Sequence, residues 1–198
     1  MGKIFYLMGK SSSGKDTIYR ELLRADAGKG FLKAIVSYTT RPIREGEREG
    51  REYYFVGEEE FQRLHKLGKV IEHREYHTCH GIWRYFMVDD GQVVPEEKRN
   101  YLMIGTLEGY TSLKQYFGEN QVVPILIELD DGDRLQRALN RERKQQNPKY
   151  QEMCRRFLAD SEDFAEEKIQ AAEIDKRFRN EDLKKCLAEI MDYILSMG

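Results

Sequence analysis

The stretch 9–17, which reads GKSSSGKDT, is the feature that most constrains how this chain folds. An apolar run at 4–8 precedes it, and a segment whose apolar residues Ile18, Leu22 and Leu23 have helical spacing follows it. Strand, glycine-bounded loop and helix form the context that the phosphate-binding pattern GxxxxGK[ST] requires. Small residues let consecutive backbone N–H groups turn toward an anion, and the helix N-terminus adds partial positive charge. The sequence therefore predicts a phosphate-binding loop (P-loop); the alternative is a Gly/Ser-rich turn that binds nothing.

Three neighbouring residues define the chemistry expected of this loop. We expect Lys15 to reach the terminal phosphates of a nucleotide as a mobile charge. Asp16 stands where the pattern has a Ser or Thr that ligates Mg²⁺, and a hydroxyl appears only at Thr17. We therefore hypothesise that Mg²⁺ is held through Thr17 and waters, with Asp16 in the outer shell. The expected ATP-binding residues in the loop are Gly9, Lys10, Ser11, Ser12, Ser13, Gly14, Lys15, Asp16 and Thr17.

Length and charge exclude several other classes of protein. A chain of 198 residues suits one α/β domain, and a net charge of −2 gives no electrostatic footprint for nucleic acid or an anionic membrane. We therefore expect neither as a partner. No signal peptide is apparent, and the three scattered cysteines do not suggest a disulfide framework. A cytoplasmic location is expected.

Hydrophobic patterning predicts alternating strands and helices, which is typical of a parallel central sheet. Residues 31–88 are richer in short strands and are expected to carry a small sheet of their own. The chain after 131 is expected to be mostly helical, with a break near 147–148. The predicted strands are 4–8, 31–38, 53–56, 69–77, 81–88, 101–104 and 122–129; the predicted helices include 15–26, 58–67, 107–117 and 181–195.

The polar loop after the second predicted strand is a candidate second phosphate site. Arg41 and Arg44 can present planar forks to a phosphate, and Ser37 and Tyr53 can add hydroxyl donors. Glu47 can accept from a substrate or orient an arginine. The alternative is a solvated charged turn with ordinary surface ion pairs. Together with a P-loop, this site is what a kinase that acts on a phosphorylated acceptor needs.

These motifs make the chain resemble the guanylate kinase family over nearly its full length. The resemblance implies a P-loop NTPase-type three-layer α/β fold with a parallel central sheet, a small mixed α/β insertion that binds a nucleoside monophosphate, and a helical lid. The implied core is about 1–33, 87–133 and 158–198, the insertion about 34–86 and the lid about 134–157. The residues that carry the resemblance are the P-loop, S-x-TTRP-x-R-x-GE-x-x-G-x-x-Y-x-FV from Ser37 to Val56, Glu59-Glu60-Phe61, Val70-Ile71-Glu72, the arginine-rich segment 134–156, and Asn180-Glu181-Asp182-Leu183.

By the same resemblance, the roles of the site residues carry over one at a time. Ser37, Arg41, Arg44 and Tyr53 match positions that hold the acceptor phosphate, Glu47 lines the same site, and Glu72 matches the acid that reads the guanine edge. Arg137, Arg141 and Arg156 match lid arginines that meet ATP phosphates and the transferring group, and Asn180 matches a residue near the adenine pocket. The implied catalytic set is Lys15, Arg41, Arg137, Arg141 and Arg156.

Two stretches depart from the family pattern. The family's Tyr-Gly-Ser/Thr element is replaced by HTCHGIWRY at 77–85, and the aspartates of the next core strand are replaced by Ile104-Gly105-Thr106, with Glu108 the nearest acid. The candidate metal ligands His73, His77, Cys79 and His80 fit no zinc spacing cleanly. The Lys-Asp pair of the P-loop is also similar to that of ribose bisphosphate phosphokinases.

The implied reaction is phosphoryl transfer from ATP to a nucleoside monophosphate, most simply GMP + ATP to GDP + ADP, with Mg²⁺ as cofactor. The alternatives are a kinase for another acceptor (dGMP, another nucleoside monophosphate or ribose bisphosphate) and a catalytically silent guanylate-kinase-like binding module. The expected partners are small-molecule nucleotides, and the expected assembly is a monomer or homodimer.

Overall fold

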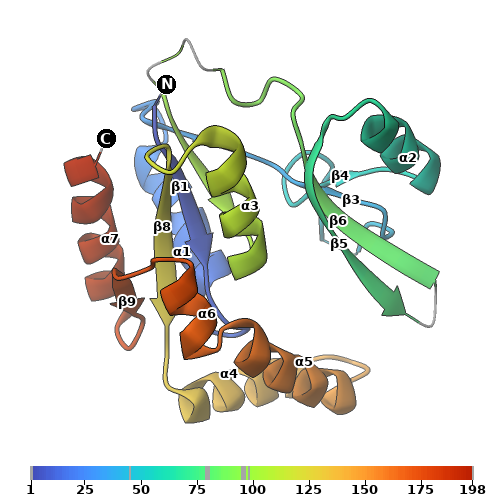
Figure 1. Cartoon of the computed structure of the whole chain (residues 1–198). Helices are drawn as coiled ribbons and strands as arrows, with labels where there is room; N and C mark the ends of the chain where they lie inside the picture. The colour runs from blue at the N-terminus through green and yellow to red at the C-terminus, as the bar shows by residue number, and fades with distance from the viewer. Residues whose placement is uncertain (1, 45, 79–80, 95–96, 98, 198) are drawn as a thin grey trace.

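The computed structural model of the chain describes residues 2–44, 46–78, 81–94, 97 and 99–197. At its centre lies a five-stranded sheet of order β2-β7-β1-β8-β9, in which every pairing is parallel. Figure 1 shows this sheet between two layers of helices. The strands are β1 (Ile4–Met8), β2 (Leu32–Ala34), β7 (Asn100–Ile104), β8 (Val122–Glu128) and β9 (Arg177–Arg179).

Helices cover both faces of this sheet because its central strand is buried on both sides. Successive side chains of a strand point to opposite faces, so Phe5 and Leu7 join a core cluster with α1 and α7. Ile4, Tyr6 and Met8 join a second cluster with α3 and α6. The four helices are α1 (Lys15–Asp26), α3 (Leu107–Phe117), α6 (Glu166–Ala171) and α7 (Leu183–Met197).

The insertion forms a separate four-stranded sheet of order β4-β3-β6-β5. Its strands are β3 (Tyr38–Thr39), β4 (Tyr54–Phe55), β5 (Val70–Thr78) and β6 (Gly81–Val88). One face is covered by α2 (Glu58–Lys66), whose Phe61 and Leu64 pack against Phe86 and Val88. The other face is turned toward the core and carries the candidate acceptor residues described below.

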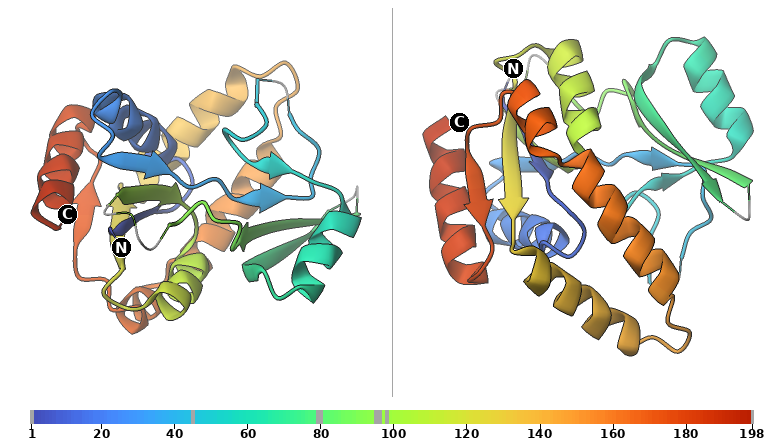
Figure 2. Two further views of the ribbon diagram at one scale, coloured as in Figure 1. Left: turned by 90° about the horizontal axis from the view of Figure 1, so that it is seen from above. Right: turned by 60° about the horizontal axis from the view of Figure 1, so that its bottom comes forward.

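Two further helices, α4 (Asp131–Arg143) and α5 (Tyr150–Asp163), extend from the end of β8. Figure 2 shows this pair projecting beyond the core on the side of the insertion. Asp130 begins α4 by accepting hydrogen bonds from the N–H groups of Gly132 and Asp133, an N-cap of the usual kind. No helix in the described ranges is long and apolar enough to cross a bilayer.

The predicted parallel sheet, the insertion sheet and the helical break near 147–148 are confirmed. The single strand predicted at 31–38 is wrong, because β2 belongs to the core sheet and β3 to the insertion sheet. Ile35 and Val36 between them are buried, so the apolar run continues across the crossing. The strand β9 was not predicted, because only Phe178 in its Arg-Phe-Arg sequence is buried. The last helix begins at Leu183 rather than at 181.

Tyr6 couples the central strand to the start of α3. Its side chain is fully buried, its hydroxyl accepts a hydrogen bond from the backbone of Thr106, and burial raises its pKa well above the ordinary value. The hydroxyl occupies space beside two glycines. A Cβ built on Gly105 or Gly109 would lie 1.9 or 2.4 Å from it. Glycine at these positions is therefore required by the buried tyrosine.

We expect Gly109→Ala to lower the free energy of unfolding by about 1–3 kcal/mol, because the added methyl group overlaps the Tyr6 hydroxyl. In a Tyr6→Phe background the same change should be neutral or stabilise by up to about 1 kcal/mol, since alanine is the better helix former. Urea denaturation of the four proteins measures this coupling. An equal cost of Gly109→Ala in both backgrounds would contradict the packing.

Candidate active site

The P-loop joins β1 to α1 with three residues in positive-φ conformations, Gly9 (154°), Ser12 (64°) and Gly14 (94°). A Cβ on Gly9 would lie 2.4 Å from the carbonyl oxygen of Ile127 in β8. Only glycine allows this close approach. The loop then ends at the N-terminus of α1, where Lys15 begins the helix. The first N–H groups of a helix have no intrahelical acceptor and are suited to an anion.

Asn180 holds the P-loop from the side of β9. Its buried side-chain amide donates to the carbonyl oxygen of Ser13 at 2.7 Å, and its own N–H donates to the carbonyl oxygen of Glu128 at 2.9 Å. Arg137 of α4 in turn donates to the Asn180 carbonyl oxygen at 3.2 Å. A Cβ on Gly14 would lie only 2.1 Å from the Asn180 amide nitrogen. The structure thus brings Asn180 and Arg137, both expected on the ATP side, to the P-loop.

The residues expected to hold Mg²⁺ lie directly after the loop glycine. The Asp16 carboxylate is 3.7 Å from the Lys15 ammonium nitrogen, and 77% of the Asp16 side chain is exposed. The Thr17 residue is partly exposed one position further on. Carboxylate and hydroxyl oxygens are ligands that Mg²⁺ accepts, and such sites take most remaining ligands from phosphate and water. These two residues therefore fit an ion that is bound together with a nucleotide.

A buried ion pair that sequence reasoning missed holds the P-loop from the side of the lid helices. Arg134 of α4, whose side chain is 1% exposed, donates to the Ser11 carbonyl oxygen at 3.0 Å and to the Asp160 carboxylate of α5 at 3.0 Å. Asp160 accepts from the Ser11 N–H at 2.8 Å and from its hydroxyl at 3.2 Å. Arg134 also pairs with Asp131 and lies 4.9 Å over the Phe157 ring. The one signal in the sequence is helical spacing, since Arg134, Arg137 and Arg141 lie three and four residues apart.

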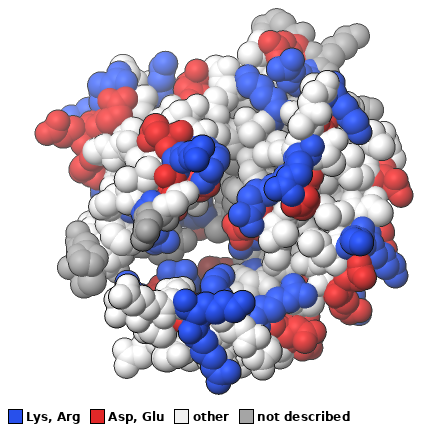
Figure 3. All heavy atoms as spheres, turned by 180° about the vertical axis from the view of Figure 1, so that it is seen from behind, with Lys and Arg blue, Asp and Glu red and all other residues white. Residues whose placement is uncertain are grey.

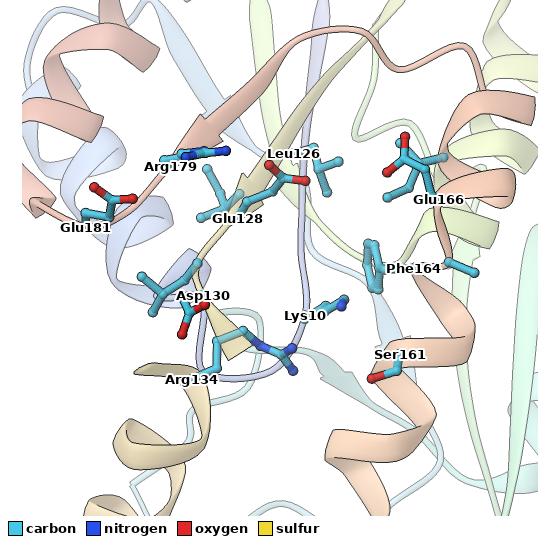
Figure 4. A pocket seen from close by; sticks show the side chains of 14 residues that line it. Lys10, Leu126, Glu128, Asp130, Arg134, Ser161, Phe164, Glu166, Arg179 and Glu181 are labelled. Carbon is cyan, nitrogen blue, oxygen red and sulfur yellow. The ribbon is translucent and has the colours of Figure 1, made fainter. Parts of the chain in front are cut away.

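A cavity of about 580 Å³ lies behind this ion pair, between the end of β8 and the helices α5 and α6. Figure 4 shows Lys10 and Arg134 in its wall, with Phe164 and Glu166 across from them. Lys10 is 3.6 Å from Asp131. The side chain of this predicted ATP-binding residue thus lies on the far side of the loop, with its charge already paired.

Arg41 is the centre of the candidate acceptor site. Its guanidinium forms two short hydrogen bonds with Glu47, at 2.7 and 2.6 Å, and donates to the Tyr85 hydroxyl at 3.1 Å. The hydrogen bonds from Arg41 hold the pKa of the Glu47 carboxyl below its ordinary value. The structure therefore brings Arg41 and Glu47 together, and Glu47 orients the arginine.

Aromatic rings enclose this arginine. The guanidinium carbon lies 5.2 Å from the Tyr53 ring centre, 5.3 Å from that of Phe55 and 6.0 Å from that of Tyr85. Tyr53 and Tyr85 also meet edge to face at 5.5 Å. A cation over such rings is stabilised most when water is excluded. Tyr85 belongs to the stretch 77–85, which differs from the family pattern, and it is thus part of the same cluster. Cys79 and His80 of that stretch lie outside the described residues.

The other predicted acceptor residues lie around this cluster. Arg44 is exposed, and its backbone N–H donates to the Glu47 carboxylate at 2.8 Å. The Ser37 carbonyl oxygen accepts from the N–H of Tyr54 at 2.9 Å, which pairs the two short strands. The Arg44 side chain is therefore placed at the surface beside the buried Arg41–Glu47 pair, where a phosphate in water can reach it.

Glu72 lies in β5 beside an arginine that was not predicted as a site residue. Only 6% of the Glu72 side chain is exposed, and Arg74 faces it at 3.3 and 3.4 Å. Burial raises the pKa of the Glu72 carboxyl, and the charge of Arg74 opposes that rise. Arg74 is two residues from Glu72 and so lies on the same strand face, which was the available signal.

The two halves of the site face each other across a cleft between core, insertion and lid. Figure 3 shows Lys and Arg side chains on both sides of a hollow in this part of the surface. Such an arrangement concentrates positive charge around the hollow, which favours anionic ligands.

The remaining lid arginines are less fixed. Arg141 is exposed on α4. Arg156 is 46% exposed and bonds Glu152 at 2.8 Å, one turn earlier in α5. Hydrogen bonds from Arg155 and Arg156 lower the pKa of Glu152 to about 2. In the described part of the chain, neither Arg141 nor Arg156 is held at the P-loop in the way that Arg134 and Arg137 are.

We expect Asp160→Ala to lower the free energy of unfolding by about 1–3 kcal/mol, because it removes one of the two carboxylates paired with the buried Arg134 and the acceptor of the Ser11 N–H. Glu162→Ala, an exposed change two residues along the same helix, should alter stability by about 0.5 kcal/mol or less. Chemical denaturation of both variants compares them directly. Equal stability of the two variants would show that the Arg134–Asp160 pair does not hold the P-loop.

Comparison with known proteins shows to which family the chain is similar. A sequence model described as guanylate kinase matches residues 1–197. The chain is 28% identical over 190 residues to a guanylate kinase of Paraburkholderia xenovorans, covering 96% of this chain and 77% of that protein. It is 27% identical over 193 residues to a guanylate kinase of Porphyromonas gingivalis, covering 96% and 95%.

A match to a guanylate kinase of Anaplasma phagocytophilum is local, with 41% identity over 91 residues, and spans 46% of this chain and 42% of that protein. The crystal structure of guanylate kinase from Anaplasma phagocytophilum superposes with a TM-score of 0.66 at 24% identity, over 98% of this chain and 85% of that one. This likeness concerns the fold, a P-loop α/β core. Because the family match covers almost every residue, the chain belongs to the guanylate kinase family, a family of nucleoside-monophosphate kinases.

Proposed function

We propose that this protein transfers the γ-phosphoryl group of ATP to a nucleoside monophosphate, with GMP, which its relatives' names imply, as an acceptor. The observation that carries the proposal is the opposition of two phosphate sites. The P-loop ends with Lys15 at a helix N-terminus, and the insertion carries the Arg41–Glu47 pair, which we take to lie on the opposite side of the hollow. The hollow lined by Lys and Arg side chains in Figure 3 supports this arrangement.

Phosphoryl transfer requires positioning and charge more than covalent chemistry. Lys15 and the N–H groups at the start of α1 would bind the donor phosphates. Arg44 and the one N–H of Arg41 that its hydrogen bonds to Tyr85, Pro42 and Glu47 leave free would bind the acceptor phosphate, with aromatic rings enclosing Arg41. Mg²⁺, when bound with ATP through Thr17 and Asp16, would neutralise charge between the phosphates. A phosphate acceptor needs no strong general base.

The proposed division of the chain follows these roles. The core (1–33, 87–133 and 158–198) binds the donor, the insertion (34–86) binds the acceptor, and the lid (134–157) brings Arg137, Arg141 and Arg156 over the transferring group. The Arg134–Asp160 contact at the base of the lid supports a lid that pivots about a fixed P-loop. We further propose a cytoplasmic enzyme that acts as a monomer or homodimer, on free nucleotides.

A coupled assay of ADP release with Mg-ATP tests the proposal against its alternatives. GMP, dGMP, AMP, CMP, UMP and ribose bisphosphate are supplied one at a time. Turnover with a nucleoside monophosphate supports it, whereas turnover with ribose bisphosphate alone would favour the sugar phosphate kinase. Silence toward every acceptor would favour a binding module.

Within this assay, we expect Lys15→Ala to reduce kcat by at least roughly 10²–10³-fold, because a preorganised charge on the transferring group is lost. Lys29→Ala removes an exposed lysine beyond the end of α1 and should leave kcat unchanged. A Lys15→Ala variant that folds and retains the kcat of the natural protein would refute the kinase assignment.

A further inference from the structure

Arg74 links the insertion to the edge of the core sheet. It lies in β5 opposite Tyr85 of β6, on the face that carries Glu72 and Tyr76. Its Nη1 donates to the Thr106 hydroxyl at 2.8 Å, at the N-cap of α3. Its Nε and Nη2 atoms lie 3.3 and 3.4 Å from the two oxygens of the Glu72 carboxylate. Both oxygens of the acid therefore face the guanidinium.

The arginine, rather than the acid, reaches the neighbouring cavity. A cavity of about 730 Å³ lies between β5, α3 and the helices α5 and α6, which is ample for a nucleobase. Arg74, Tyr76, Thr106 and Glu108 line it, whereas Glu72 is absent from its described lining. The Glu72 side chain is 6% exposed against 16% for Arg74. A ligand entering the cavity thus meets the guanidinium first.

The chemistry of a guanidinium restricts which base it can read. It has five N–H donors and no acceptor, so Thr106 and Glu72 leave it donors for a ligand. Its Nε is buried against Glu72, so the donors open to a ligand are the remaining N–H groups of Nη1 and Nη2. A purine with a 6-oxo group offers O6 and N7 as acceptors, whereas adenine places an amino donor at the same position. The site should therefore favour 6-oxopurines over adenine.

The same geometry keeps Glu72 from reading the 2-amino group of guanine. That group is a donor and needs an acceptor. Reading it together with the neighbouring ring N–H takes both oxygens of one carboxylate side by side, and at Glu72 that pair of oxygens faces Arg74. A nucleotide that lacks only the 2-amino group should then lose little binding.

We propose that Arg74 is the residue that determines acceptor specificity, and that it makes 6-oxopurine nucleotides in general, IMP as well as GMP, acceptors of this enzyme. This inference rests on the proposed function. In it, Arg74 donates to the 6-oxo group, and Glu72 holds the arginine in place. The substrate class is thus set by the 6-position of the purine and not by the 2-position.

The test is the specificity constant, kcat/KM, for GMP, IMP and AMP in the natural protein and in Arg74→Met. We expect the kcat/KM values for GMP and IMP to lie within about tenfold of one another. The value for AMP should be at least about a hundredfold lower, since the N–H donors of Arg74 would face the amino donor of adenine. Arg74→Met exposes the Glu72 carboxylate to the base. It should therefore raise the GMP-to-IMP ratio by more than about tenfold, because GMP now offers two donors to a free acid.

Two results would overturn the inference while leaving the kinase intact. One is a GMP-to-IMP preference above about tenfold in the natural protein, and the other is a ratio unchanged by Arg74→Met, which would assign base reading to another residue such as Glu108. Turnover of none of the three nucleotides would instead refute the proposed function, and this inference with it.

Two further variants distinguish a loss of base recognition from a loss of folding. Arg74→Lys keeps a charge beside Glu72 but loses the planar fork, so kcat/KM for both GMP and IMP should fall by roughly tenfold with no change in KM for ATP. Unchanged constants in this variant would also overturn the inference. His77→Ala, an exposed change on the opposite face of β5, should leave all three acceptors unaffected.

Discussion

The P-loop is held from outside by side chains, and the rest of the site depends on this. A loop that binds phosphate through its own N–H groups needs other residues to fix its shape. Asn180 and Arg134 hold it by the carbonyl oxygens of Ser13 and Ser11. These supports come from β9 and α4, which meet the loop at the carboxyl edge of the parallel sheet. The order of strands therefore determines where nucleotide phosphate can bind.

The insertion holds the Arg41 guanidinium in one position, where it would bind the phosphate of the proposed acceptor. Arg41 is 3% exposed, and an isolated buried charge would be costly. Glu47 neutralises part of that charge, and Tyr53, Phe55 and Tyr85 surround the rest. The same sheet carries the Glu72–Arg74 pair two strands away. In the proposed function, phosphate binding and base reading would thus take place on one face of the insertion sheet.

Local patterns in the sequence predicted much of this. The P-loop, its flanking strand and helix, and the Arg41–Glu47 segment are contiguous, so their residues could be identified from residue type and spacing together with the family resemblance. The contacts that sequence reasoning missed join distant segments: Arg134 meets Ser11 123 residues away, and Arg74 meets Thr106 32 residues away. No local pattern marks such pairs. The passage of the chain from β2 to β3 was missed for a related reason, because Ile35 and Val36 remain buried while the chain changes sheets.

The central claim is that two nucleotides bind at once, with their phosphates facing each other between the P-loop and Arg41. The most direct measurement is the binding of a bisubstrate analogue in which adenosine and guanosine are joined by five phosphates. Calorimetry should give one analogue per chain, at least about a hundredfold tighter than ATP or GMP alone, and both nucleotides should be displaced. An analogue that bound no more tightly than ATP and left GMP in place would contradict the facing arrangement.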